Sequence, residues 1–390
     1  MAELNPHFEK LPKTYIFPII DEKLDAMRKK NPKKEILNLG VGDVSLPLVP
    51  EIAHAIQDAV LEMTKAPRGY GPSEGLPLLR ETICAHEYAV FGMTPDEIFI
   101  SDGTNADASS IQELFSDRNT VAIADPTYPV YLDANLIAGK SILLFPTTEE
   151  EGFIPRPPKE KADLAYLCTP CNPTGVAMTR EDLRQWIGWA KENDAILIID
   201  NVYSPFIFSE EVPKSIYEID GADEVAIEMR SFSKAAGFTG LRCGYMVVPK
   251  TIKQGKLHAM WQRRTSAKSN GVSYPIQKGA AICYEKQTAV KLKEQIAIYQ
   301  ASALSLRNAL TEQGQTFFGG VDSPYIFWKA PNGVSSWEFF DQLLEKSQIV
   351  AIPGSGFGSC GEGYIRLSCF LPKTTATKAT HALHRLFTTT

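Results

Sequence analysis

The stretch SFSKAAGFTGLR, residues 231–242, places one lysine in an unusual setting. Lys234 is flanked by serine and followed by alanines and glycines, and Arg242 lies eight positions further along. A lysine amine acts as a nucleophile only when it is neutral, and both partial desolvation and a scarcity of neighbouring carboxylates lower its pKa. This stretch therefore predicts either an ordinary solvated side chain or a reactive amine, and the other polar residues of the chain have to decide between them.

Four further polar residues stand at or near the ends of short apolar runs, or within one. Asp200 ends the run AILIID, and Tyr203 lies just beyond it. Asn172 belongs to TPCNPTG, which follows LAYLC, while Arg366 stands within YIRLS. Taken singly, each residue has a simpler explanation, since Asp200 could cap a helix and Arg366 could make a surface ion pair. Their ordered combination with Lys234 is more specific than any one of them.

The elements that carry these residues alternate between strands and helices. Short apolar runs at 121–126, 164–170 and 195–200 are separated by helical patterns such as 179–194. Thr179 can cap that helix, whose first turn is acidic. Strands that alternate with helices predict an α/β fold with a largely parallel sheet. Because ligands gather at the carboxyl ends of parallel strands, we expect the polar residues to meet there.

The last part of the chain has a different pattern. Helical patterns at about 285–313 and 335–346 surround the strands YIFWKA and YIRLSCF, which predicts a smaller α+β domain. No linker rich in Pro, Gly or Ser precedes it, so we expect a continuous helix to join the two parts. The expected division is an N-terminal arm with part of the small domain at 1–45, a large domain at 46–280 and the small domain at 281–390.

Composition excludes several classes of function. The 390 residues carry a formal net charge of −6 with no basic stripe, so a nucleic-acid partner is not expected. No apolar run approaches the ~20 residues of a membrane span, and the N-terminus lacks the apolar segment of a secretory signal. The seven scattered cysteines fit reduced thiols better than a disulfide framework. Together these features predict a cytoplasmic protein.

Two motifs mimic sites. CTPC, from Cys168 to Cys171, has the spacing of a zinc or redox pair, but no second close pair of ligands exists and the motif runs into the turn signal NPTG. The glycine cluster at 353–363 mimics a dinucleotide loop, but a strand rather than a helix follows it. We therefore expect no metal site, and we interpret the glycine cluster as the loop that places Arg366.

The order Asn-Pro-x-Gly, Asp-x-x-Tyr, Ser-x-Ser-Lys, Arg and a C-terminal Arg resembles the aspartate-aminotransferase-like pyridoxal-phosphate enzymes of fold type I. The resemblance implies a large domain with a mixed, mostly parallel sheet and a smaller α+β domain. It also implies that Lys234 forms a Schiff base with pyridoxal 5'-phosphate and that Asp200 pairs with the pyridine nitrogen. Tyr203 and Asn172 would hydrogen-bond the phenolic oxygen of the cofactor ring, and Tyr128 would stack on the ring.

The remaining site residues follow from the same resemblance. Arg366 would bind the substrate α-carboxylate bidentately. The cofactor phosphate would contact Arg242 and Ser231, and the wider set of implied cofactor residues includes Ser233, Thr104, Asn105, Tyr70 and Asn270. The implied substrate residues, in addition to Arg366, are Tyr15, Gly42, Ser73, Asn105, Tyr128 and Asn172.

The resemblance narrows to the LL-diaminopimelate aminotransferases over nearly the whole chain. RGYGP at 68–72, EIFISDG at 97–103, NGVSY at 270–274 and IPGSGFG at 352–358 carry it. That family makes LL-diaminopimelate with glutamate as amino donor. It forms homodimers with shared active sites, so Tyr70 and Asn270 would reach into the partner's site and Tyr15 would help to cover the substrate.

Two positions depart from the family pattern. Ser73 stands where the family has an acid that faces the distal ammonium of the substrate, and Asn105 stands where it has a lysine near the distal end. Because a substrate with two charged ends should feel both losses, we expect weak turnover of LL-diaminopimelate and a preference for an amino acid whose far end is bulkier or differently charged.

Three functions stay open at this point. The first is an aminotransferase of this family that acts on an L-amino acid. The second is an enzyme with the same cofactor that diverts the carbanion to elimination, replacement or carbon–carbon bond formation, for instance in specialised metabolism. The third is a non-catalytic binding protein, and the intact Lys234 speaks against it.

Overall fold

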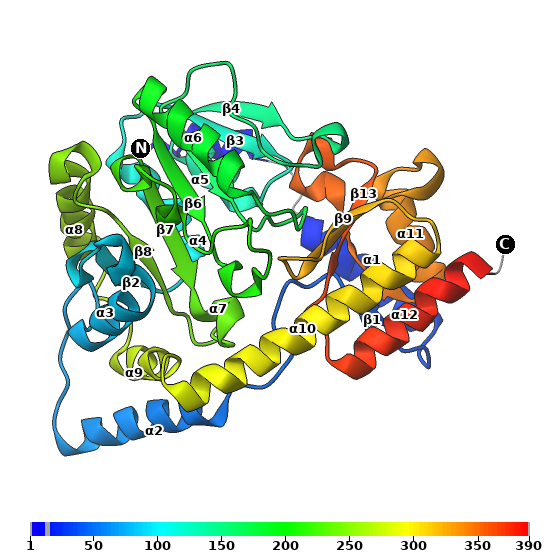
Figure 1. The fold of residues 1–390 in the computed structure, drawn as a ribbon. Helices are drawn as coiled ribbons and strands as arrows, with labels where there is room; N and C mark the ends of the chain where they lie inside the picture. The colour runs from blue at the N-terminus through cyan, green and yellow to red at the C-terminus, as the bar shows by residue number, and fades with distance from the viewer. Residues whose placement is uncertain (1, 12–15, 389–390) are drawn as a thin grey trace.

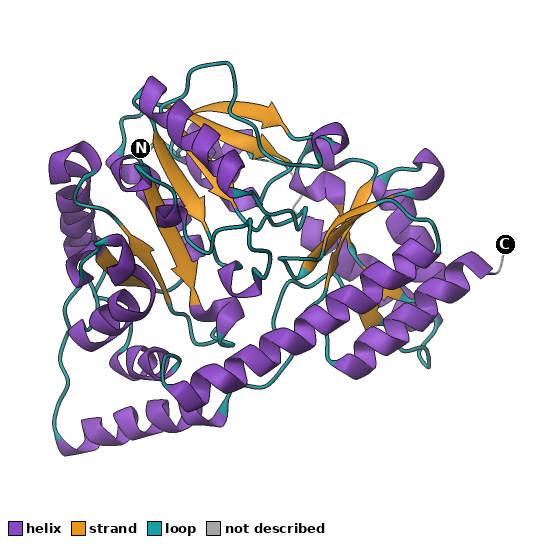
Figure 2. Ribbon diagram, in the orientation of Figure 1, coloured by secondary structure: helices purple, strands orange, loops and turns teal. Residues whose placement is uncertain are grey.

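The structure is a computed structural model that describes residues 2–11 and 16–388. Its larger part is built on a seven-stranded sheet in the order β2-β8-β7-β6-β5-β3-β4 (Figures 1 and 2). The five strands from β7 to β4 are parallel, and β8 runs antiparallel to both of its neighbours. In sheet order, the strands are β2 (Ile98–Ser101), β8 (Gly244–Val247), β7 (Ala226–Ser231), β6 (Ile196–Asp200), β5 (Leu164–Cys168), β3 (Thr120–Asp125) and β4 (Ser141–Pro146). The mixed, mostly parallel sheet expected from the sequence is thereby confirmed.

Helices cover both faces of this sheet, because successive strand residues point to opposite faces and both sets are apolar. Ala165 and Leu197 face one core with Trp186, whereas Tyr166 and Ile198 face another with Trp261. The helices of this part are α2 (Pro50–Lys65), α3 (Pro77–Ile83), α4 (Thr104–Ser110), α5 (Pro129–Ile137), α6 (Arg180–Asn193), α7 (Phe232–Ala235), α8 (Lys256–Lys268) and α9 (Tyr274–Ile282).

The start of α6 agrees with its sequence signal. The Thr179 hydroxyl accepts the backbone N–H of Asp182, and the Asp182 carboxylate in turn accepts the backbone N–H of Thr179 at 2.9 Å. This reciprocal capping box satisfies donors that the helix itself leaves unpaired. The cap predicted at Thr179 is confirmed.

The smaller part contains an antiparallel four-stranded sheet in the order β12-β13-β10-β9. These strands are β12 (Ile352–Pro353), β13 (Tyr364–Ser368), β10 (Tyr325–Lys329) and β9 (Phe317–Gly319). A parallel pair joins β1 (Leu37–Asn38) to β11 (Ile349–Val350), so the N-terminal segment packs with the C-terminal one. The helices are α1 (Ile16–Lys30), α10 (Lys286–Glu312), α11 (Ser336–Ser347) and α12 (Lys373–Thr388).

Helix α10 connects the two parts. Leu292, near its start, is buried in the core of the larger part, and Leu306, further along, is buried in the core of the smaller one. Figure 1 shows α10 as one long yellow helix that runs from beneath the large sheet to the small one. The continuous connecting helix expected from the sequence is therefore present.

Of the two site-like patterns, CTPC spans the end of β5 and the segment after it, and the glycine cluster forms a loop. All seven cysteines are free, and the residues that the structure describes contain no group of His, Cys, Asp or Glu that could hold a metal ion. The glycine cluster at 353–363 forms two short 3-10 turns that lead directly into β13, the strand of Arg366. Across the described ranges, no helix is both long and apolar enough to cross a membrane.

Candidate active site

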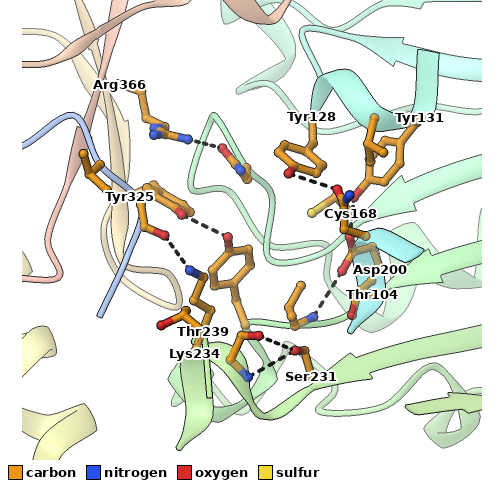
Figure 3. Close-up of a pocket in the computed structure, with 18 of the residues that line it drawn as sticks. Thr104, Tyr128, Tyr131, Cys168, Asp200, Ser231, Lys234, Thr239, Tyr325 and Arg366 are labelled. Atoms are coloured by element: carbon orange, nitrogen blue, oxygen red, sulfur yellow. Dashed lines mark hydrogen bonds between the residues drawn. The ribbon is translucent and has the colours of Figure 1, made fainter. Parts of the chain in front are cut away.

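A cavity of about 300 Å³ opens at the carboxyl edge of the parallel strands, between the two parts of the chain (Figure 3). Cys168, Asp200 and Ser231, the last residues of β5, β6 and β7, all line it. The small sheet contributes Tyr325 and Arg366 from the opposite side. The other predicted residues at its wall are Gly42, Thr104, Asn105, Tyr128, Asn172, Tyr203, Ser233, Lys234 and Arg242.

Lys234 is not a solvated surface residue. It lies in α7, and its Nζ donates a hydrogen bond to the Gly42 carbonyl at 2.6 Å and stands 3.6 Å from the Asp43 carboxylate. Burial is the main cause that lowers the pKa of Lys234, and the charges of Arg366 and Arg242 lower it further, while Asp43 acts in the opposite direction. The neutral, nucleophilic form of this amine is therefore more accessible than that of an exposed lysine.

Asp200 is a buried carboxyl at the end of β6. Burial raises its pKa to about 6, although hydrogen bonds from the Tyr131 hydroxyl and from the backbone N–H of Val202 favour the charged form. Tyr131 comes from α5 and is itself fully buried. This partnership was not predicted from the sequence, because a tyrosine inside an apolar helix is most simply a core residue.

A pair of buried tyrosines lines the cavity. The hydroxyl oxygens of Tyr203 and Tyr325 lie 2.9 Å apart, and their rings meet edge to face. A Cβ placed on Gly42 would lie 2.3 Å from the Tyr325 hydroxyl, so any larger residue would displace this hydroxyl. Tyr325 is a second residue that sequence reasoning missed, since nothing local distinguishes it from the other apolar residues of β10.

Arg366 is buried rather than engaged in a surface ion pair. Its Nη1 donates to the Asn172 side-chain oxygen and its Nη2 to the Gly40 carbonyl, both at 2.7 Å. The guanidinium carbon lies 4.6 Å from the Tyr325 ring centre and 4.9 Å from that of Phe357. These bonds use two of the five guanidinium N–H groups, which leaves a cation with donors to spare inside the cavity.

Hydroxyl and guanidinium groups gather at the other end of the cavity. The Ser231 hydroxyl donates to that of Ser233 at 2.9 Å, and Arg242 reaches Ser233 at 3.3 Å. The Thr104 hydroxyl, at the start of α4, is buried and has no hydrogen-bond partner among the described residues. A Cβ on Gly103 would lie 2.5 Å from Nη2 of Arg242, so the backbone approaches this cation closely. Such a cluster suits an anion.

Two neutral side chains, Asn105 and Tyr128, lie together at the wall of the cavity. The Tyr128 hydroxyl donates to the Asn105 side-chain oxygen at 3.2 Å, and Asn105 itself is exposed. Tyr128 meets the Tyr131 ring edge to face at a centroid distance of 5.8 Å. Asn105, which the family resemblance places near the far end of the substrate, thus offers an amide next to the phenol of Tyr128.

Three predicted residues lie away from the cavity of their own chain. Ser73 stands 3.1 Å from the Ser266 hydroxyl, Tyr70 is 89 % exposed, and Asn270 is exposed. None of them lines the cavity. Tyr15 falls outside the described residues.

Known proteins resemble this chain in both sequence and fold. The family model of aminotransferase class I and II matches residues 34–386. The LL-diaminopimelate aminotransferase of Agathobacter rectalis is 45% identical over 388 residues, 95% of this chain and 96% of the relative, and that of Lawsonia intracellularis is 44% identical over 95% of both. The solved structure of L,L-diaminopimelate aminotransferase from Chlamydomonas reinhardtii is 38% identical and superposes with a TM-score of 0.93 over 99% of each chain.

The hydrogen bond between Tyr131 and Asp200 makes a prediction about titration. Because the phenol stabilises the carboxylate, Tyr131→Phe should raise the pKa of Asp200 above its value of about 6. Infrared difference spectra of the cofactor-free protein identify the carboxyl band of Asp200 as the one that is absent in Asp200→Asn. The titration midpoint of this band should lie at higher pH in Tyr131→Phe than in the wild-type protein.

Tyr166→Phe is the matched control. Tyr166 stacks on Tyr131, but its hydroxyl donates to the Ala108 carbonyl instead of Asp200, so its loss should leave the midpoint in place. An unchanged midpoint in Tyr131→Phe would mean that the phenol does not set the charge of Asp200.

Proposed function

The chain belongs to the class I and II aminotransferases, which depend on pyridoxal phosphate, and from this premise we propose that it transfers the amino group of an L-amino acid whose α-carboxylate is held by Arg366. One observation carries the proposal. A single cavity holds a mostly buried amine of lowered pKa, Lys234, together with the buried carboxyl of Asp200 and the buried guanidinium of Arg366. Perturbed ionisable groups that converge in this way are typical of active sites.

The cavity fits the cofactor at each of its polar ends. The unpartnered hydroxyl of Thr104, with Ser231, Ser233 and Arg242, would hold the phosphate. Asp200 would hold the ring nitrogen in its protonated form, and Tyr203 and Asn172 would bind the phenolic oxygen. Tyr128 would pack on the ring face. All of these assignments join side chains that already line one cavity.

When bound, pyridoxal phosphate supplies the electron sink for the electrons released at the substrate Cα. Lys234 would supply the amine to which the cofactor attaches, and it would afterwards take up and release a proton at Nζ, which its lowered pKa allows. Arg366 would orient the substrate through its carboxylate, since a guanidinium matches that group with paired N–H donors. Tyr325 and Phe357 flank the guanidinium and keep water from part of its surface.

Amino transfer is favoured over the diverted chemistries, because the relatives that cover nearly the whole chain are aminotransferases. The test is to incubate the holoenzyme with single L-amino acids and 2-oxoglutarate and to measure both products by mass spectrometry. We expect L-glutamate and the matching oxo acid in equal amounts. Release of ammonia, or of a coupled product, without L-glutamate would replace this proposal with the diverted function.

We propose that the far end of the substrate is read by neutral groups. Asn105 and Tyr128 lie together at the wall of the cavity, and neutral groups give weaker hydrogen bonds than charged ones. A distal charge enclosed without a partner is costly. We therefore infer a preference for an amino acid whose far end differs from the doubly charged one of LL-diaminopimelate, the compound after which the relatives are named.

Substrate competition tests this inference. The double variant Ser73→Glu, Asn105→Lys should raise kcat/KM for LL-diaminopimelate. The lysine introduced at position 105 would lie in its own cavity, and the glutamate introduced at position 73 would reach the cavity of the partner in the homodimer proposed below, so that both distal charges gain partners. Ser266→Ala is the control, since it removes only the neighbour of Ser73 and should change little. A wild-type kcat/KM for LL-diaminopimelate of about 10⁴ M⁻¹s⁻¹ or more, the ordinary range for enzymes, would show that these two positions do not set the preference.

We also propose that the protein is a cytoplasmic homodimer in which the partner subunit completes each cavity. Within each subunit, we propose a large domain at 46–280 and a small domain at 281–390, to which the arm at 1–45 contributes. Tyr70 and Asn270 are exposed and lie away from the cavity of their own chain, which suits residues that act in the other subunit. From the family resemblance alone, we propose that Tyr15, which lies outside the described residues, helps to cover the substrate.

Hybrid dimers make this arrangement testable. Lys234→Ala and Tyr70→Ala proteins should each be inactive or nearly so, and mixing them should restore part of the activity, because one of the two composite sites regains every wild-type residue. Subunit exchange is followed separately with differently tagged chains. If exchange occurs and no activity returns, Tyr70 does not act in the partner's site. A mixture of Lys234→Ala with Asn270→Ala tests Asn270 in the same way.

A further inference from the structure

One buried carboxylate outside the cavity ties the two parts of the chain together. Asp125, the last residue of β3, is 7% exposed. Its Oδ2 accepts the backbone N–H of Ser359 at 3.1 Å and the Ser359 hydroxyl at 2.6 Å, and its Oδ1 accepts the backbone N–H of Cys360 at 3.1 Å. Three donors from one short segment of the smaller part thus converge on a single side chain of the large sheet.

The backbone before Ser359 also packs closely against this carboxylate. Gly358 has a φ of +139°, and a Cβ built there would lie 1.9 Å from Oδ1 of Asp125. Next to it, the backbone N–H of Thr127 donates to the Phe357 carbonyl at 2.9 Å. Four hydrogen bonds therefore hold the segment 357–360 against residues 125–127. A glycine is required at 358 both by its backbone conformation and by the space that the carboxylate fills.

The segment 357–360 leads directly to the substrate end of the cavity. The Phe357 ring lies 4.9 Å from the Arg366 guanidinium carbon, and Tyr325 lies on the same cation at 4.6 Å. Pairing of β12 with β13 sets Ile352, five residues before this segment, opposite Arg366. Tyr128, three residues after Asp125, lines the cavity from the large part. The position of Asp125 thus fixes Tyr128 and Phe357 relative to each other.

We propose that Asp125 is a positioning residue for the substrate carboxylate. By holding the segment 357–360, it keeps Phe357 packed on Arg366 and so fixes the direction of the guanidinium N–H groups. This inference rests on the proposed role of Arg366 and goes beyond it, because Asp125 itself touches neither substrate nor cofactor. A simple loop cap is the competing role, and it predicts a general loss of stability instead of a change in carboxylate recognition.

The experiment compares L-glutamate with its α-amide as amino donors for the holoenzyme. Wild-type protein should prefer the free carboxylate strongly. Asp125→Ala should lower that preference by roughly tenfold or more, mainly by raising KM for L-glutamate, since displacement of a positioning group by about 1 Å can cost up to 10²-fold. Bound cofactor, measured by its absorbance, and kcat at saturation should change little. Ser359→Ala, which removes only the 2.6 Å hydrogen bond, should show a smaller shift in the same direction.

Two controls separate the possible failures. Asp163→Ala removes a carboxylate that accepts the backbone N–H of Thr120 at the opposite end of β3, and it should leave the preference unchanged. Arg366→Lys should abolish the preference whether or not Asp125 matters. If Arg366→Lys leaves it intact, the proposed carboxylate site is wrong. If Arg366→Lys abolishes the preference while Asp125→Ala and Ser359→Ala do not alter it, the positioning role of Asp125 is overturned. The role is also overturned if Asp125→Ala and Ser359→Ala bind less cofactor and have a lower kcat in addition to a higher KM.

Discussion

The parallel pairing of β5, β6 and β7 is the constraint on which the site depends. In register, Cys168 lies directly opposite Asp200, and Ser231 ends the next strand two residues beyond the partner of Asp200. Because parallel strands end at the same edge, three chain segments far apart in sequence deliver their polar ends to one place. The connecting helix α10 then brings the small sheet, with Arg366, across the opening of that edge.

Three ionisable side chains share the cavity at this edge. A lysine, an aspartate and an arginine are all withdrawn from water in one cavity, and each such burial is unfavourable unless hydrogen bonds compensate it. Asp200 has Tyr131 and the Val202 N–H, and Arg366 has Asn172 and Gly40. Among the described residues, Lys234 has the Gly42 carbonyl, the more distant Asp43 carboxylate and the Phe370 ring, whose centre lies 5.7 Å from Nζ. Burial nevertheless lowers the pKa of Lys234, the group that the proposed chemistry requires in its neutral form.

The sequence predicted what depends on order along the chain. The parallel sheet, the connecting helix, and Lys234 and Asp200 as cavity residues follow from apolar runs and the polar residues at their ends. Tyr131 and Tyr325 could not be found in this way, because their roles arise from contacts such as the one between Tyr203 and Tyr325, 122 residues apart. Asp125 does stand near the end of the apolar run 121–126, but nothing in the sequence indicates its contact with Ser359, 234 residues further along. A buried tyrosine in an apolar helix or strand looks the same in sequence whether or not it holds a catalytic group.

The central claim is that Lys234 is the amine that holds the cofactor. Reduction of the holoenzyme with borohydride, followed by proteolysis and mass spectrometry, tests it directly. The account predicts that the reduced cofactor is bonded to the peptide that contains Lys234 and that Lys234→Ala protein takes up no covalent label. A label on another lysine, or none in the wild-type protein, would contradict it.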